Sequence, residues 1–245
     1  MPTLAVGSTW TRPADGMVMV SVPAGSFIMG SNGGDLDKTP VHKVNLDAFW
    51  IDKTEVTNRM YADCVTAGAC QVPSSSQSFT HNNYYDNPQY ADYPVIYMGW
   101  NSAQSYCKWA GARLPSEAEW EKAARGTDGR IFPWGNDGPD NSLLNYNQNV
   151  GDTTAVGSYP SGASPYGALD MAGNVWEWVS DWYDKTYYDQ SARSNPEGPS
   201  NGTYRVMRGG AWNSDDYYVL ASSRGGSNPA NAYYEFGIRC SRSSP

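Results

Sequence analysis

Glycine and proline interrupt this chain so often that few stretches are long enough to form an extended helix. The 245 residues include 25 Gly and 16 Pro, and both recur in turns because each suits backbone conformations that other residues adopt less easily. This composition favours short strands joined by long ordered loops over a helical bundle. A chain of this length buries a proper core as one large domain.

Helix signals are confined to three short segments. Thr57 suits the N-cap of the first segment, and Asn101 with Gln104 has the spacing of a capping box at the start of the second. Ser116 and Glu119 repeat that spacing at the start of the third. We therefore expect two main helices and a short third one, at residues 57–68, 101–111 and 116–126.

Strand signals are short and are broken by glycines. The alternating run at 17–31 predicts a β-hairpin, and residues 42–56 predict a second pair of strands. Two main helices on a twisted antiparallel sheet, with much irregular structure, make an α+β domain. We place this domain at residues 16–245 and interpret residues 1–15 as a linker-like segment. Further strands are expected at 174–183, 205–212 and 235–242, and a long loop at 71–93.

Charge and hydropathy exclude some partners. The net charge of −8 and the pI near 4.7 argue against nucleic acid, whose phosphates need a basic face. No run of 18 apolar residues occurs, so we expect no membrane span within the chain. The N-terminus lacks a signal-peptide pattern. Because a linker-like beginning also fits one domain cut from a longer protein, this says little about location.

The four cysteines allow two interpretations. Cys64 and Cys70 close a short loop, Cys107 lies on an expected helix, and Cys240 lies in the last expected strand. Two disulfides would fit an oxidising compartment, and would favour an extracellular or cell-surface location, whereas four buried thiols would fit the cytosol; we prefer disulfides. No zinc-site spacing occurs, and with 2 His the chain has little material for a metal–His site or a Ser–His–Asp triad.

The run WNSDDYYVLASSRGGSNPANAYYEFG, at residues 212–237, is built almost entirely from Asn, Ser, Asp, Tyr, Gly and Ala. Tyrosine offers a large amphipathic contact at low entropy cost, and small polar residues offer adaptable hydrogen bonds. This composition is typical of a recognition surface. The candidate ligand-binding residues are Trp212, Asn213, Ser214, Asp215, Asp216, Tyr217, Tyr218, Ser223, Gly225, Ser227, Tyr233, Tyr234 and Glu235.

Seven motifs occur in a fixed order along the chain. They are FIMGS, PVHKVNLDAFWIDKTEVTNRMY, PVIYMGWNSAQSYCKWAGARLPSEAEWEKAARG, FPWGN, YGALDMAGNVWEWVSDWY, RVMRGGAW and FGIRC. In this order they resemble the formylglycine-generating enzyme, or sulfatase-modifying factor, family. The resemblance covers the chain from about Gly16 onward, and it implies a variant of the C-type lectin fold, often with bound calcium.

Catalytic members of that family oxidise a substrate cysteine with a pair of active-site cysteines that bind copper. Soft thiolates suit copper(I) and oxygen chemistry. The matching positions here are Ser214 and Val219, so the resemblance implies neither copper nor formylglycine formation. Cys107 and Cys240 match the family's structural disulfide instead. The sulfoxide synthases of the family need a His-based iron site from an additional domain, for which this chain has no material.

Structural calcium is the cofactor that the resemblance implies. Side chains of Asp170 and Glu177 and carbonyls of Gly173 and Val175 match the family's calcium loop, with Asp170 where some members have asparagine. A hard cation prefers such an all-oxygen shell. The alternative is that Asp170 caps a turn and Glu177 is a solvated strand charge. A second calcium site is expected from Asn145, the carbonyl of Tyr146, and Asp152.

Residues 212–237 also resemble the variable region of diversity-generating retroelement proteins, which use this same fold. Asn, Ser, Asp, Tyr, Gly and Ala all arise from an AAC codon by changes at adenines alone, and every residue from Asn213 to Tyr218 obeys this. Ala232 departs from the pattern, since it stands where an arginine is frequent. The matching framework residues are Arg205, Arg208, Gly209, Gly210, Trp212, Arg224, Pro229, Gly237 and Arg239.

We therefore predict a non-catalytic ligand-binding protein that recognises a protein or other surface ligand through a hypervariable face on a calcium-stabilised scaffold. An undiversified binding or accessory domain is supported equally, because ordinary members of the family are Asn-rich in this region too. Two alternatives stay open. One is a sulfatase-modifying oxidase, from the whole-chain match, and the other is a sensor domain of a larger signalling protein, from the linker-like N-terminus.

Overall fold

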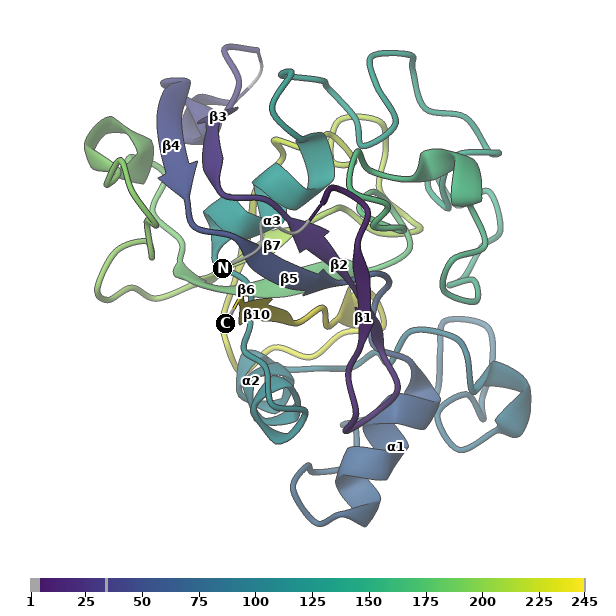
Figure 1. Cartoon of the computed structure of the whole chain (residues 1–245). Coiled ribbons are helices and arrows are strands. Elements are labelled where there is room, and N and C mark those ends of the chain that lie inside the picture. The colour runs from purple at the N-terminus through teal and green to yellow at the C-terminus, as the bar shows by residue number, and fades with distance from the viewer. Residues whose placement is uncertain (1–4, 34, 245) are drawn as a thin grey trace.

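The computed structural model describes residues 5–33 and 35–244, which form an α+β fold with three α-helices and three small sheets (Figure 1). Within those residues no helix is long and apolar enough to cross a membrane. The helices are α1 (Asn58–Thr66), α2 (Trp100–Trp109) and α3 (Glu117–Arg125), with 3-10 turns η1 (Leu36–Lys38), η2 (Pro88–Tyr90), η3 (Pro160–Gly162) and η4 (Tyr187–Gln190). The strands are β1 (Thr9–Thr11), β2 (Val18–Val22), β3 (Gly25–Met29), β4 (His42–Leu46), β5 (Phe49–Asp52), β6 (Trp176–Trp182), β7 (Arg205–Arg208), β8 (Gly225–Ser227), β9 (Phe236–Gly237) and β10 (Ser241–Ser243).

The central sheet separates two hydrophobic cores. It is antiparallel, in the order β1-β2-β5-β10. Because successive side chains of a strand point to opposite faces, Met19 and Trp50 pack into one core with residues of α1 and α2. Their neighbours Val20 and Ile51 pack into the other core with residues of α3. Figure 1 shows the same division, with α3 on one side of this sheet and α1 and α2 on the other.

Two of the three expected helix starts are confirmed. The Thr57 hydroxyl accepts from Met60 N at 3.3 Å, and the capping box of Ser116 and Glu119 is complete. The box expected at Asn101 is wrong, because α2 begins at Trp100 with Gly99 as N-cap. The N-cap lies two residues earlier than expected because Trp100 is anchored there, its backbone N donating to Pro229 O and its indole N to Val179 O.

The expected strand pairings at 17–31 and 42–56 are wrong. Strands β2 and β3 lie in different sheets, as do β4 and β5; β3 pairs with β4, and β2 pairs with β5. Lys122 of α3 binds the connection between β2 and β3, because its Nζ donates to Pro23 O at 2.7 Å and to Gly25 O at 2.9 Å. These carbonyls therefore bond to a helix side chain instead of closing a hairpin turn.

The N-terminal segment is part of the fold and not a linker over its described length. Strand β1 pairs with β2. Arg12, which is 1% exposed, donates to the carboxylates of both Asp15 and Asp52. This buried ion cluster ties the segment to β5, so the domain boundary expected at residue 16 is wrong. Residues 1–4 of the expected linker lie outside the described residues.

All four cysteines are paired, as expected. Cys64 bonds to Cys70 across the end of α1, and Cys107 of α2 bonds to Cys240, which directly precedes β10. No cysteine is free. The second disulfide joins residues 133 positions apart and fastens the last strand of the chain to the layer of α1 and α2.

Candidate functional site

The candidate binding segment, residues 212–237, follows β7 and returns to the same sheet. Gly209 and Gly210 have φ of +97° and +72°, a region that glycine enters without steric cost. A Cβ on Gly210 would meet Tyr218 O at 2.9 Å, so this glycine permits the close return of the chain. The segment then rejoins the sheet as β8, antiparallel to β7, and as β9, parallel to β6.

Arg208 holds the middle of this segment from the protein interior. Its side chain is fully buried and donates to three consecutive backbone carbonyls, those of Ala221 at 2.9 Å, Ser222 at 3.2 Å and Ser223 at 2.7 Å. Nη2 also donates to Glu121 Oε2 of α3 at 2.6 Å. The backbone of residues 221–223 is therefore fixed by a buried side chain and not by its own exposed residues.

Arg224 forms the second anchor. Its Nε and Nη2 donate to the two carboxylate oxygens of Glu117 at 2.6 and 2.8 Å, and Nη1 donates to Asp37 O. Burial alone would raise the pKa of Glu117, but Arg224 and Arg208 outweigh it and hold that pKa below its usual range. Glu117 therefore stays ionised, and the first turn of α3 is locked to the candidate segment.

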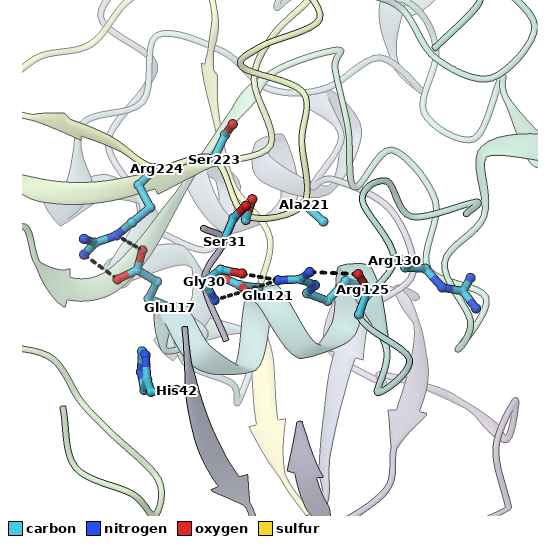
Figure 2. A network of polar contacts seen from close by, with 12 residues as sticks. Gly30, Ser31, His42, Glu117, Glu121, Arg125, Arg130, Ala221, Ser223 and Arg224 are labelled. Carbon is cyan, nitrogen blue, oxygen red and sulfur yellow. Dashed lines mark hydrogen bonds and ion pairs between the residues drawn. The ribbon is translucent and has the colours of Figure 1, made fainter. Parts of the chain in front are cut away.

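The network continues through α3 to the end of β3 (Figure 2). Glu121 Oε1 accepts from Gly30 N at 2.7 Å and from Arg125 Nη1 at 2.9 Å, and Arg125 also donates to Gly30 O at 2.7 Å. Figure 2 shows these groups along one side of the helix, with the Arg224–Glu117 pair at its start. Neither glutamate could be assigned a role from the sequence, because only the tertiary structure brings α3 under residues 212–237.

Ten of the expected ligand-binding residues reach the surface, and we call these ten the binding face. Trp212, Ser214 and Ser223 do not, being 2%, 8% and 2% exposed, and their expected role is corrected. Ser214 Oγ accepts from Ala211 N and Ser223 Oγ donates to Tyr217 O, so both hydroxyls hold the loop together. The binding face consists of Asn213, Asp215, Asp216, Tyr217, Tyr218, Gly225, Ser227, Tyr233, Tyr234 and Glu235.

Aromatic rings gather at two places on this face. Tyr218 lies 5.3 Å from Tyr217 and 6.2 Å from Trp176, measured between ring centroids. Tyr234 lies 5.8 Å from Trp212. The two groups are connected through Glu235, whose carboxylate accepts from Asn213 Nδ2 at 2.7 Å and whose carbonyl accepts from Trp176 N at 2.8 Å.

Phe79, which the sequence did not single out, joins the second aromatic group. Its ring centroid lies 5.2 Å from that of Trp212 and 5.3 Å from that of Tyr234, and it is 59% exposed. Asp152 fixes it, since one carboxylate oxygen accepts from Ser78 Oγ, Thr80 N and Thr80 Oγ1 at 2.6 to 2.8 Å. Both neighbours of Phe79 are thus held by one buried acid, more than 70 residues away in the sequence.

Two of the expected calcium ligands, Glu177 and Asp152, accept hydrogen bonds from protein groups instead. Both carboxylate oxygens of Glu177 accept from Arg239 at 2.7 to 3.0 Å, and Oε2 also accepts from Trp120 Nε1 at 2.6 Å. Glu177 is therefore neither a solvated charge nor free for a cation, and its assignment is corrected. Asp152 is corrected as well, because its oxygens receive the hydrogen bonds described above and one from Thr153 N.

Other oxygens near the expected calcium loops lack partners. Asn145 Oδ1 and Glu55 Oε1 are buried without a hydrogen-bond partner among the described residues. Burial, together with the neighbouring Asp170 carboxylate, raises the pKa of Glu55. Burial likewise raises the pKa of Asp170, although Gly157 N donates to it. These acceptors fit a cation in part, so calcium stays a prediction, with Asn145, Glu55 and Asp170 as the oxygens that suit it.

Three expected calcium contacts, at Gly173, Val175 and Tyr146, are backbone carbonyls of the same loops. Gly173 has φ of +77°, and a Cβ there would lie 2.2 Å from Asn145 O, so the two expected calcium loops touch at this point. Val175 is fully buried. Tyr146 donates its hydroxyl to Pro139 O at 3.1 Å. Among the described residues no group of three or more His, Cys, Asp or Glu side chains is arranged to hold a metal ion.

The positions that match the oxidase thiolates are closed. Val219 is fully buried, and Ser214 is 8% exposed with its hydroxyl bonded to the backbone. Because all four cysteines form disulfides, the chain offers no thiolate ligand for copper at this place. A surface of exposed tyrosines, acids and small residues stands there instead.

The fold and this surface together define a class of protein: α+β domains of the C-type lectin-like type. They have little regular secondary structure around the loop segment that buried side chains hold, which is residues 212–237 here. More specifically, the chain belongs to the sulfatase-modifying factor family, because the family model described as "Sulfatase-modifying factor enzyme 1-like domain" matches residues 7–244.

Proteins similar to the chain in sequence include enzymes, and a solved variable protein is similar to it in fold. The formylglycine-generating enzyme of Streptomyces coelicolor is 33% identical over 286 residues, covering 94% of this chain and 90% of that enzyme. The serine/threonine-protein kinase pkn1 of Chlamydia caviae is 38% identical over 239 residues; the match covers 91% of this chain but spans only 38% of the kinase's length. Treponema denticola variable protein 1 superposes with a TM-score of 0.77 at 23% identity, covering 98% of this chain and 100% of that one, a likeness of fold.

Proposed function

We propose that this chain is a non-catalytic binding domain that recognises its ligand through the binding face. The observation that carries the proposal is the division of labour in residues 212–237. Buried Arg208 and Arg224 hold the backbone, while tyrosines and acids on either side of them reach solvent. A preorganised loop loses less entropy on binding, and rigid tyrosines supply contact area.

Diversification of this face is part of the proposal. Asp215, Asp216, Tyr218 and Tyr233, each of which can arise from an AAC codon by changes at adenines alone, are all exposed, so changing them leaves the buried anchors untouched. A reverse-transcriptase gene and an adenine-containing template repeat beside this gene would establish diversification. Their absence would leave an undiversified binding domain.

The binding proposal is tested directly by selecting a library of random phage-displayed dodecapeptides on the intact protein. Replacing Tyr217, Tyr218, Tyr233 and Tyr234 together by alanine should abolish binding of the enriched peptides while the circular dichroism spectrum is retained. Tyr204→Ala is the matched control, because Tyr204 is 48% exposed but lies outside residues 212–237. Peptides that bind the four-tyrosine variant unchanged would contradict the proposal.

Enzyme activity is tested separately. The proposal expects no formylglycine formation on a Cys-x-Pro-x-Arg peptide in the presence of copper and oxygen, because Ser214 and Val219 provide no thiolate for the metal. Mass spectrometry of the peptide would detect the cysteine-to-aldehyde conversion. Any conversion above the level measured without protein would contradict the non-catalytic proposal and would show that the chain is an enzyme.

A second candidate function is a sensor or accessory domain within a longer signalling protein. It is favoured by the match to the chlamydial kinase, of which a domain of this kind makes up about two-fifths, 38% of the length. The sequence of the full-length gene decides it. A kinase or membrane-spanning segment in the same reading frame would support this role, which is compatible with ligand binding.

A further inference from the structure

The exposed charge of the binding face has one sign. Its acidic groups are Asp215, Asp216 and Glu235, and Arg224 is the one basic residue within 212–237. Arg224 is buried and paired with Glu117, so it does not offset these acids at the surface. Among the described residues none of the three acids forms an ion pair. A partner of complementary charge is therefore cationic.

Exposed rings lie among these acids. Phe79, Tyr218 and Tyr233 are 59%, 44% and 48% exposed, and the faces of such rings attract Lys and Arg side chains. The fold already uses one ring of the binding face in this way, because Lys38 Nζ lies 4.4 Å from the ring centroid of Tyr217. Acids beside aromatic faces are a suitable surface for guanidinium or ammonium groups.

Phe79 adds a fixed contact to this surface. Asp152 restrains both of its neighbours, as described above, so the ring needs little ordering when a partner arrives. Exposed aromatic anchors of this kind carry a large share of binding energy in protein interfaces. We call the binding face together with Phe79 the composite face.

One buried donor at the composite face lacks an acceptor. Trp212 is 2% exposed, its ring contacts Phe79 and Tyr234, and its indole N–H has no hydrogen-bond partner among the described residues. An unpaired buried donor is costly. Because this nitrogen is itself buried, Trp212 is not a contact for the ligand; its ring packs against Phe79 and Tyr234 from within the protein.

We propose that the composite face binds a basic protein segment, with arginine or lysine side chains against Phe79 and the tyrosines and paired with Asp215, Asp216 and Glu235. This proposal rests on the binding function proposed above and names its ligand class. Phe79 contacts the ligand directly and lies outside residues 212–237, so it contributes to recognition whatever residues the variable segment carries.

The test uses the peptides enriched on the intact protein from the dodecapeptide library. The enriched sequences should carry a net positive charge, and their affinities are measured by fluorescence anisotropy with synthetic labelled copies. Phe79→Ala and the triple variant Asp215→Asn, Asp216→Asn, Glu235→Gln should each weaken binding about tenfold or more. Raising the salt from 50 to 500 mM should weaken binding to the wild type more than to the triple variant, since screening removes the same attraction.

A charge-matched control separates local pairing from overall charge. The variant Asp63→Asn, Asp189→Asn, Glu197→Gln removes the same three charges from exposed positions outside the composite face. It should change peptide affinity by less than about twofold, because none of these three groups belongs to the composite face and salt screens the interaction of exposed charges that do not pair directly.

The possible results distinguish the two proposals. Enriched peptides that are neutral or acidic, or that lose no affinity with the triple variant, overturn the basic-segment proposal. If these peptides still fail to bind the four-tyrosine variant, the proposed binding function stands. Peptides that bind the four-tyrosine variant and the triple variant as tightly as the wild type overturn both proposals. A loss of peptide affinity with the triple variant but none with Phe79→Ala would show that Phe79 does not contact the ligand. A library that enriches no peptide contradicts the basic-segment proposal.

Discussion

Glu117 and Arg224 form a two-point ion pair that joins the first turn of α3 to the loop carrying the binding face, with N–O distances of 2.6 and 2.8 Å. The two residues are 107 positions apart, and both are buried. The pair makes the geometry of the surface depend on a helix that contributes no residue to the binding face.

Breaking this pair should destabilise the protein strongly. Glu117→Gln leaves Arg224 buried without its counter-charge, and we expect a loss of about 3–5 kcal/mol in the free energy of unfolding. Urea denaturation measures it. The control is Arg59→Ala, which removes an exposed ion pair with Asp92 whose side chains are 59% and 68% exposed, and which should cost about 0–1 kcal/mol. Equal losses for both variants would contradict the buried anchor.

Asp152 should control the order of the loop that presents Phe79. Asp152→Ala removes the acceptor of Ser78 and Thr80, so we expect faster proteolytic cleavage within residues 71–93 and weaker peptide binding. Limited proteolysis followed by mass spectrometry locates the cuts. Asp140→Ala is the control, since the Asp140 carboxylate accepts only from Ser142 two residues away, in an exposed turn. Unchanged cleavage within 71–93 would show that Asp152 does not hold this loop.

Asp181 should make stability fall as the pH rises. Burial, with the nearby Glu117 carboxylate, raises the pKa of Asp181 to about 7. The folded state therefore keeps its proton to a higher pH than the unfolded state, whose aspartate pKa is about 3.9. The unfolding free energy is highest below that value and decreases up to about pH 7, by at most about 1.4 kcal/mol per pH unit. Urea denaturation between pH 4.5 and 8 should show a shallower decline for Asp181→Asn, and identical slopes would refute the assignment.

The two disulfides should differ in their effect on stability. Cys107–Cys240 joins residues 133 positions apart, and Cys64–Cys70 joins residues only 6 apart. A longer closed loop removes more entropy from the unfolded chain, so loss of the first should cost about 5 kcal/mol and loss of the second about 2. Denaturation of the two double-alanine variants measures the difference. A larger loss from Cys64→Ala, Cys70→Ala would contradict this order.

Calcium should raise the melting temperature if the predicted cation site exists. Two buried acids, Glu55 and Asp170, lie close together, and the Asp170 carboxylate adds to burial in raising the pKa of Glu55; a divalent cation would relieve this repulsion. We expect a higher Tm in millimolar CaCl2 than in EGTA, and a reduced difference for Glu55→Gln. Equal Tm values with and without calcium would contradict the predicted calcium site.

Local features were predictable from the sequence wherever neighbouring residues decide the structure. The capping pair of Ser116 and Glu119 and the Thr57 cap were correct because such caps form within one turn of helix. The α+β class and the surface position of most of residues 212–237 followed from composition and motif order. The Asn101 cap failed because a tertiary contact of Trp100 shifted the helix start.

Only the tertiary structure decided how the strands pair and what supports the binding face. Lys122 binds the connection between β2 and β3, and Arg239 pairs with the Glu177 carboxylate expected to bind calcium. Ser214 and Ser223 are of a residue type that suits a contact surface, yet they lie buried because their hydroxyls bond to the loop backbone. Short-range patterns specify caps and turns, whereas burial and long-range ion pairing depend on which distant segments the fold brings together, and a single sequence does not display that.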